Sequence, residues 1–140
     1  MKISARVDNS FRSHAVTLST NGAARALTIP PGTDGFGSSA NGGELLCLAL
    51  ATCYCNDLYR EARKRGIEVE RVEVDVEATF GVEGAAAEQL AYRARVSARA
   101  PRETIIDLMR HTDTVAEIQN TLRLSCPVVL AGMEANEDTR

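Results

Sequence analysis

The sequence contains no tryptophan, and aromatic residues make up only 4% of its 140 residues. It also lacks an excess of positive charge, because its formal net charge is −3 and its pI is near 5.4. A nucleic-acid-binding protein needs a clustered basic surface. The one basic run, "REARKRG" at residues 60–66, is interrupted by acid and is interpreted as a solvated helix face. We therefore expect no nucleic-acid partner.

Long apolar runs are missing as well. No window approaches the roughly 20 apolar residues that span a bilayer, and the opening residues 1–8, "MKISARVD", lack the apolar core of a signal peptide. We therefore expect no membrane partner and a cytoplasmic location. In a reducing cytosol the four cysteines do not predict a disulfide framework, so buried packing residues, a redox site and a metal site all stay open.

No linker rich in Pro, Gly or Ser divides the chain. Its 44% hydrophobic content is enough for a core. The sequence therefore predicts a single domain over residues 1–140.

The N-terminal third has the pattern of antiparallel strands. Residues 14–20 and 23–29 flank Asn21-Gly22, a dipeptide that accepts positive φ at both positions of a tight turn and so predicts a β-hairpin. Apolar residues alternate over 3–7, which indicates a third strand. Because side chains alternate across a strand, His14 shares a face with Val16 and Leu18 and is expected to point inward.

A glycine-rich loop over residues 30–43 precedes a long predicted helix from Glu44 to Lys64, with Gly66 as its stop. The helix is apolar almost all round as far as Cys55, so its first half is expected to be buried centrally. Residues 72–80 and 90–98 alternate as two half-buried strands, one with an acidic and one with a basic outer face.

The C-terminal third predicts two helices and a strand. Pro101 opens the first helix, and Thr114 with Glu117 has capping-box spacing, so a second helix is expected to begin near Asp113 or Thr114. Residues 126–130, "CPVVL", are expected to form a closing strand. The element order predicts an α+β fold, with helices against one side of a curved antiparallel sheet.

Three of the four cysteines lie in "NGGELLCLALATCYCND", residues 41–57. Residues two apart on a helix differ by roughly 200° around the axis, so Cys53 and Cys55 cannot ligate one ion or form a disulfide together. Asp57 and the two histidines supply no familiar ligand spacing, so we expect no metal. Cys47 and Cys55 are interpreted as packing residues. Cys53 is either a buried core cysteine or a working thiol.

The remaining candidates indicate no cofactor. The glycine loop lacks both the G-x-G-x-x-G order and the Lys-Ser/Thr of a phosphate-binding loop. His111 lies near the end of its predicted helix and is interpreted as a surface or capping residue.

The stretch "NGGELLCLALATCYCNDL" resembles the signature of the OsmC/Ohr family, in which a similar entry leads into an Ala-rich helix that carries the peroxidatic cysteine. The residues that share its register are Asn41, Glu44, Leu45, Ala49, Ala51 and Cys53. The order of hairpin, glycine loop, central helix, strands and paired C-terminal helices is also similar, so the resemblance covers nearly the whole chain.

The resemblance implies an intertwined homodimer in which the cysteine, here Cys53, attacks a hydroperoxide and forms a sulfenic acid. In the family, an Arg of the N-terminal hairpin and a Glu at the start of the central helix hold the thiolate ready. The Arg position is matched by His14, with Arg12 as the alternative if the register slips by two. The Glu position is matched by Gly43, and Glu44 matches a second carboxylate of the family.

A second cysteine between the two C-terminal helices resolves the sulfenic acid in the family. The helix pattern places Asp113 at that position and leaves Cys126 in the closing strand; the alternative register would make Cys126 the resolving residue. We therefore expect a hydroperoxide reductase that uses Cys53 and an external thiol reductant. The alternative hypothesis is a dimer without catalysis that binds a small apolar ligand at its interface.

Overall fold

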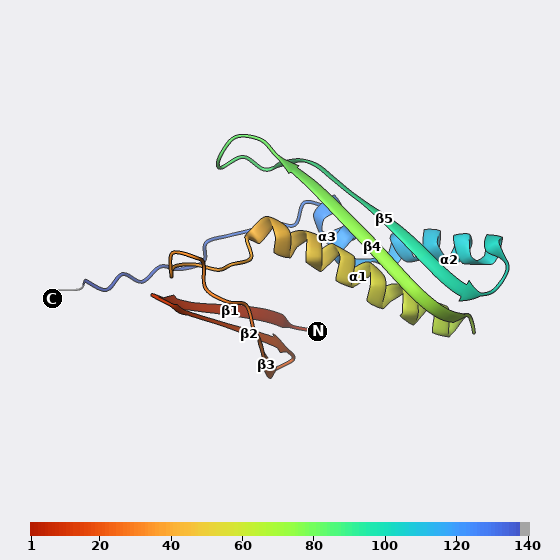
Figure 1. Cartoon of the computed structure of the whole chain (residues 1–140), viewed down its shortest axis with the longest axis horizontal. Helices are drawn as coiled ribbons and strands as arrows, with labels where there is room; N and C mark the ends of the chain where they lie inside the picture. The colour runs from red at the N-terminus through yellow and green to blue at the C-terminus, as the bar shows by residue number, and fades with distance from the viewer. Residues whose placement is uncertain (138–140) are drawn as a thin grey trace. The chain divides into compact units, whose positions relative to one another are not determined.

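The structure is a computed structural model that describes residues 1–137. It is an α+β fold of five strands and three helices in the described residues, with the order β1 (Ile3–Ser10), β2 (Ser13–Thr20), β3 (Ala23–Leu27), α1 (Gly42–Lys64), β4 (Glu68–Phe80), β5 (Ala87–Arg99), α2 (Arg102–Val115) and α3 (Glu117–Arg123) (Figure 1). The predicted fold class is confirmed. No helix among residues 1–137 is long and apolar enough to cross a membrane.

The described chain forms two compact units. The first unit contains residues 1–49 and 76–91, and the second contains residues 50–75 and everything from Tyr92 onward. α1, β4 and β5 each contribute to both units. The prediction of a single domain stays a prediction.

In the first unit, β1, β2 and β3 form an antiparallel sheet, in which Ile3 pairs with Thr20 and Val16 with Leu27. The turn at Asn21 and Gly22 has positive φ at both residues, 50° and 84°. This confirms the hairpin predicted from that dipeptide. Along β2, His14, Val16 and Leu18 are half-buried while the residues between them are exposed, so the predicted shared face is also confirmed.

The helix α1 begins at a capping box, because Asn41 Oδ1 accepts from the Glu44 N–H at 2.8 Å and Glu44 Oε1 accepts from the Asn41 N–H at 2.9 Å. It ends at Gly66, where φ is +67° and the Ile67 N–H donates to the Ala62 carbonyl at 2.9 Å. A positive φ at this position favours glycine over other residues. Both ends of the predicted helix are confirmed, with the start two residues earlier.

The core of the described chain lies in the second unit. Tyr54, Leu58, Ala62 and Leu108 are its buried centre, where α1 meets α2, and apolar side chains of β4 and β5 pack against it. Charged side chains also pair between these two strands: Arg99 lies 3.0 Å from Glu70, and Arg95 lies 3.6 Å from Glu73.

Two predicted features of the C-terminal third are wrong. α2 continues to Val115, and α3 begins at Glu117 after the extended residue Ala116. Thr114 does not cap α3, because its hydroxyl donates back to the His111 carbonyl at 2.6 Å. Residues 126–130 form no strand in the part of the chain that the structure describes, since no other strand pairs with them there.

Candidate functional site

Cys53 lies half-buried on α1, with a carboxylate one turn further along the helix. Its sulfur donates to Asp57 Oδ2 at 3.4 Å, and Glu117 Oε2 of α3 lies 3.8 Å from the same sulfur. Cys53 and Asp57 share a helix face because residues four apart are neighbours on the helix surface. The thiol therefore faces two acceptor groups that come from two elements.

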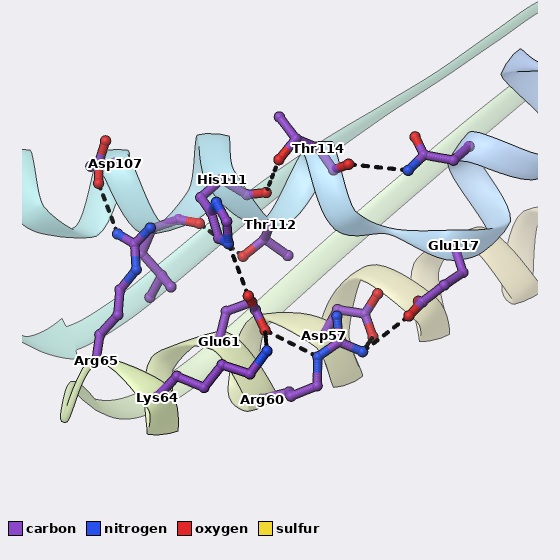
Figure 2. Close-up of polar contacts among 12 residues, drawn as sticks. Asp57, Arg60, Glu61, Lys64, Arg65, Asp107, His111, Thr112, Thr114 and Glu117 are labelled. Atoms are coloured by element: carbon purple, nitrogen blue, oxygen red, sulfur yellow. Dashed lines mark hydrogen bonds and ion pairs between the residues drawn. The ribbon is translucent and has the colours of Figure 1, made fainter.

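Arg60 holds these carboxylates in place. Its guanidinium lies 3.0 Å from Asp57 Oδ1, 3.2 Å from Glu117 Oε1 and 3.1 Å from Glu61 Oε2. Figure 2 shows Arg60 directed between Asp57 and Glu117. A hydrogen bond to a charged partner is stronger than a neutral one, so the carboxylates that face Cys53 are fixed in position by one cation.

A third carboxylate, Glu61, continues the network toward α2. It is only 5% exposed, and Lys64 at 2.8 Å and His111 at 2.9 Å contact it together with Arg60 (Figure 2). Hydrogen bonds from Lys64, His111 and Arg60 lower the pKa of Glu61 to about 2. His111 thus pairs with a buried carboxylate and does not cap the end of its helix.

The surroundings of Cys53 favour its protonated form. Burial raises the pKa of the Cys53 thiol, the negative charges of Asp57 and Glu117 raise it further, and the backbone N–H of Ile118 acts in the opposite direction. Burial also raises the pKa of Asp57, and so does its contact with Glu117, while Arg60 lowers it. At neutral pH the sulfur is therefore mainly a thiol.

The start of α3 is anchored beside this thiol by buried contacts. Ala116 is fully buried, and Gln119, which is 3% exposed, donates from Nε2 to the Leu50 carbonyl of α1 at 3.0 Å. The Gln119 Oε1 atom has no hydrogen-bond partner among the described residues. These contacts fix the Ile118 N–H and the Glu117 side chain near α1.

One group of side chains has the spacing of a metal site. Cys53, Asp57 and Glu117 each offer one ligand atom, and the three atoms lie within 4.8 Å of one another. Arg60 is hydrogen-bonded to both carboxylates, so the charge that would attract a cation is already balanced by the protein. We therefore assign no metal to these residues.

His14 lies in the first unit, whereas Cys53 lies in the second. The His14 Nδ1 atom is 2.9 Å from Asn9 Nδ2, and the Asn9 side chain is also hydrogen-bonded to the backbone of Gly37. Arg12, the alternative residue, turns between β1 and β2 with φ of 60°, and its guanidinium carbon lies 5.0 Å from the centre of the Phe11 ring. The assignment of His14 to the thiolate stays a prediction.

Gly43 lies at the edge of a pocket in the first unit. The pocket has a volume of about 400 Å³, and its lining includes Cys47, Val76, Ala78 and Phe80. A Cβ atom at Gly43 would lie 3.3 Å from the Phe80 ring, so this ring packs against the helix at the residue predicted to replace a Glu of the family. The start of α1 thus has an aromatic ring beside Gly43, with Asn41 and Glu44 at the same pocket.

Asp113 lies inside α2, one turn after Met109. It accepts hydrogen bonds from the Tyr92 hydroxyl and, at 2.7 Å, from Arg123. Burial raises the pKa of Asp113, but these hydrogen bonds outweigh it and lower the pKa overall. The residue predicted to replace a resolving cysteine therefore joins α2 to β5 through a hydrogen bond and to α3 through an ion pair.

The predicted orientation of Cys53 and Cys55 is confirmed. Cys53 faces α3, whereas Cys55 lines a pocket with Val72 and Val74 of β4. Sequence reasoning missed Asp57 and Glu117 as neighbours of Cys53. The spacing of four between Cys53 and Asp57 was a usable signal, but nothing in the sequence placed Glu117, because its helix was expected to begin earlier.

Comparison with known proteins gives one family and one fold. The sequence profile of the family described as OsmC-like protein matches residues 35–131. No curated protein matches the chain. Among solved structures, an organic hydroperoxide resistance protein OsmC from Legionella pneumophila has 19% identity and a TM-score of 0.58, with 88% of this chain and 90% of that chain covered.

Two further structures are similar. An organic hydroperoxide resistance protein from Elizabethkingia anophelis, with thiocyanate bound, has 19% identity and a TM-score of 0.59, covering 88% of this chain and 89% of that one. An OsmC-like protein from Vibrio cholerae has 16% identity and a TM-score of 0.58, covering 86% and 93%. At these identities the likeness shows a shared fold.

Proposed function

Because the chain belongs to the OsmC-like protein family, we propose that it is a thiol-dependent hydroperoxide reductase that uses Cys53. The observation that carries the proposal is the position of this cysteine on α1, with its sulfur held between Asp57, Glu117 and the Ile118 N–H. The structures from Legionella pneumophila and Elizabethkingia anophelis are organic hydroperoxide resistance proteins of the same fold.

The reaction needs only the thiol and the peroxide. The sulfur of Cys53 attacks the terminal oxygen of the hydroperoxide, the O–O bond breaks, and the products are a Cys53 sulfenic acid and an alcohol. An external thiol then condenses with the sulfenic acid to give a mixed disulfide and water. A second thiol releases Cys53 by disulfide exchange.

A pulse of tert-butyl hydroperoxide tests the proposal. With a dimedone-type trapping reagent present, wild-type protein is expected to gain one adduct by intact mass, and Cys53→Ser is expected to gain none. Cys55→Ser is the matched control, because Cys55 lies on the opposite side of α1 and should leave the adduct unchanged. Unmodified wild-type protein would overturn the peroxidase function.

His14 is proposed to favour the Cys53 thiolate, because the resemblance to the family matches it to an Arg of the N-terminal hairpin. A nearby cation or hydrogen-bond donor lowers the pKa of a cysteine. His14→Ala is therefore expected to raise the pH midpoint for alkylation of Cys53. Arg12→Ala tests the alternative register in the same assay. An unchanged midpoint in His14→Ala would leave His14 as a strand residue only.

A family protein without catalysis that binds a small apolar ligand is the second candidate. Two observations favour it: the raised pKa of Cys53, and the apolar pocket beside Gly43, which has a volume of about 400 Å³. The hydroperoxide pulse separates the two candidates, because a binding protein would keep its mass.

We also propose that the protein acts as a homodimer.

A further inference from the structure

We propose that Asp57, supported by Glu117, is the base that takes the proton from Cys53 when a hydroperoxide reacts. This inference rests on the function proposed above and names a catalytic residue for it. The chain would then activate its sulfur with a carboxylate from the same helix.

The contact between thiol and carboxylate is direct. The Cys53 sulfur donates to Asp57 Oδ2 at 3.4 Å, so this oxygen is within hydrogen-bond reach of the thiol. The Asp57 side chain is 8% exposed and is held through its other oxygen by Arg60 at 3.0 Å. A general base must lie within hydrogen-bond reach of the proton that it removes, and Asp57 meets this requirement before any substrate arrives.

Glu117 strengthens Asp57 as a base. Its carboxylate lies 3.8 Å from the sulfur and shares Arg60 with Asp57. Two carboxylates close together raise the pKa of one of them, because their like charges repel. In agreement, burial and the Glu117 carboxylate raise the pKa of Asp57. A base with a pKa nearer to neutrality accepts a proton more readily.

The thiolate that results also has a partner. The backbone N–H of Ile118 lowers the pKa of the Cys53 thiol, because a donor near the sulfur favours its charged form. The charged and titratable groups near this sulfur are Asp57 and Arg60 of α1 and Glu117 of α3; His111 of α2 contacts Glu61 instead. The sulfur therefore has a fixed donor for its charged form and a fixed acceptor for its proton.

The step is balanced. The S–H bond of Cys53 breaks, the proton moves to Asp57 Oδ2, and the sulfur electron pair forms a bond to the terminal oxygen of the hydroperoxide. The O–O bond breaks, and the departing alkoxide takes the proton back from Asp57. The products are the sulfenic acid and an alcohol, and Asp57 is again a carboxylate.

The opposite interpretation is that the two carboxylates only suppress the thiolate. The variant Asp57→Asn separates the interpretations, because asparagine keeps the shape but carries no charge and accepts no proton. In both interpretations its pH midpoint for alkylation of Cys53 falls. If Asp57 is the base, the rate of sulfenic acid formation with tert-butyl hydroperoxide at pH 7 should nevertheless fall by about 10²-fold, a typical loss when a general base is removed.

The matched control is Asp75→Asn, which removes an exposed carboxylate of β4 and should change neither quantity. Glu117→Gln, on a side chain that is 63% exposed, covers the case in which Asp57→Asn does not fold. It should also lower both the midpoint and the peroxide rate. A variant that reacts with peroxide as fast as wild type or faster overturns the inference alone, whereas a wild-type protein that forms no sulfenic acid overturns the proposed function with it.

Discussion

Sedimentation of the protein at micromolar concentration is expected to give the mass of two chains, twice 15.1 kDa. The first unit supplies one reason. Among its residues only Gly35 is buried, and β1 is exposed along its whole length. Ile3 and Val7 of this strand are 65% and 62% exposed. A three-stranded sheet needs a covered apolar face to be stable, so we infer that a second copy covers it.

The segment after α3 supplies the other reason. It carries a run of exposed apolar side chains: Leu124, Val128, Val129, Leu130 and Met133 are 77–98% exposed. Burying one such side chain stabilises by about 1.5–3 kcal/mol. The segment has the composition of a strand and no partner strand among residues 1–137. A homodimer would give it one.

The variant Val128→Asp tests this origin of the dimer. Val128 is 98% exposed in the single chain, so the substitution should not disturb the fold of that chain. A charge buried without a partner costs about 3–5 kcal/mol, so the variant is expected to sediment as one chain at concentrations where wild type is a dimer. Asn136→Asp, an exposed change in the same segment, is the control. A single-chain mass for wild type would remove the homodimer from the proposal.

Much of the fold follows from local sequence. Asn21-Gly22 determines the hairpin because few other residues adopt positive φ at both positions. Gly66 determines the end of α1 for the same reason, since its φ is +67°. The alternation in β4 and β5 is regular over many residues, and period is the strongest signal that a single sequence carries.

The errors arise where tertiary contacts outweigh a local motif. Thr114 and Glu117 have the spacing of a capping box, yet Glu117 extends to Arg60 at 3.2 Å instead of capping its own helix. That contact depends on α1, and no short window of sequence contains it. Of the two carboxylates beside Cys53, Asp57 could be predicted from the sequence, because it lies one turn along the same helix. Glu117 could not, because it belongs to α3.

The prediction of a closing strand was wrong for a related reason. The composition of residues 126–130 is that of a strand, and Val128 and Val129 favour extended backbone. A strand also needs another strand to bond, and none of the described residues supplies it. Composition predicts a tendency, whereas pairing depends on what lies beside the segment.

Limited hydroperoxide followed by a small thiol such as 2-mercaptoethanol is expected to join that thiol to Cys53 without forming a bridge within the chain. All four cysteines are free in the structure. Cys47, Cys53 and Cys55 share the rigid helix α1, and Cys53 and Cys55 face different elements, so they cannot meet the geometry of a disulfide. Asp113, the residue predicted to replace a resolving cysteine, forms an ion pair with Arg123 and offers no sulfur.

Cys126 is then the remaining thiol that could resolve Cys53 within one chain. It is exposed and follows α3, where its N–H donates to the Thr121 carbonyl at 3.3 Å. A non-reducing peptide map of wild type and Cys126→Ser is the measurement. Capture of the added thiol by Cys53 should be equal in the two proteins, because Cys126 takes no part. A Cys53–Cys126 peptide pair in wild type, with increased overoxidation of Cys53 in Cys126→Ser, would show instead that a two-cysteine mechanism operates and that no external resolving thiol is needed.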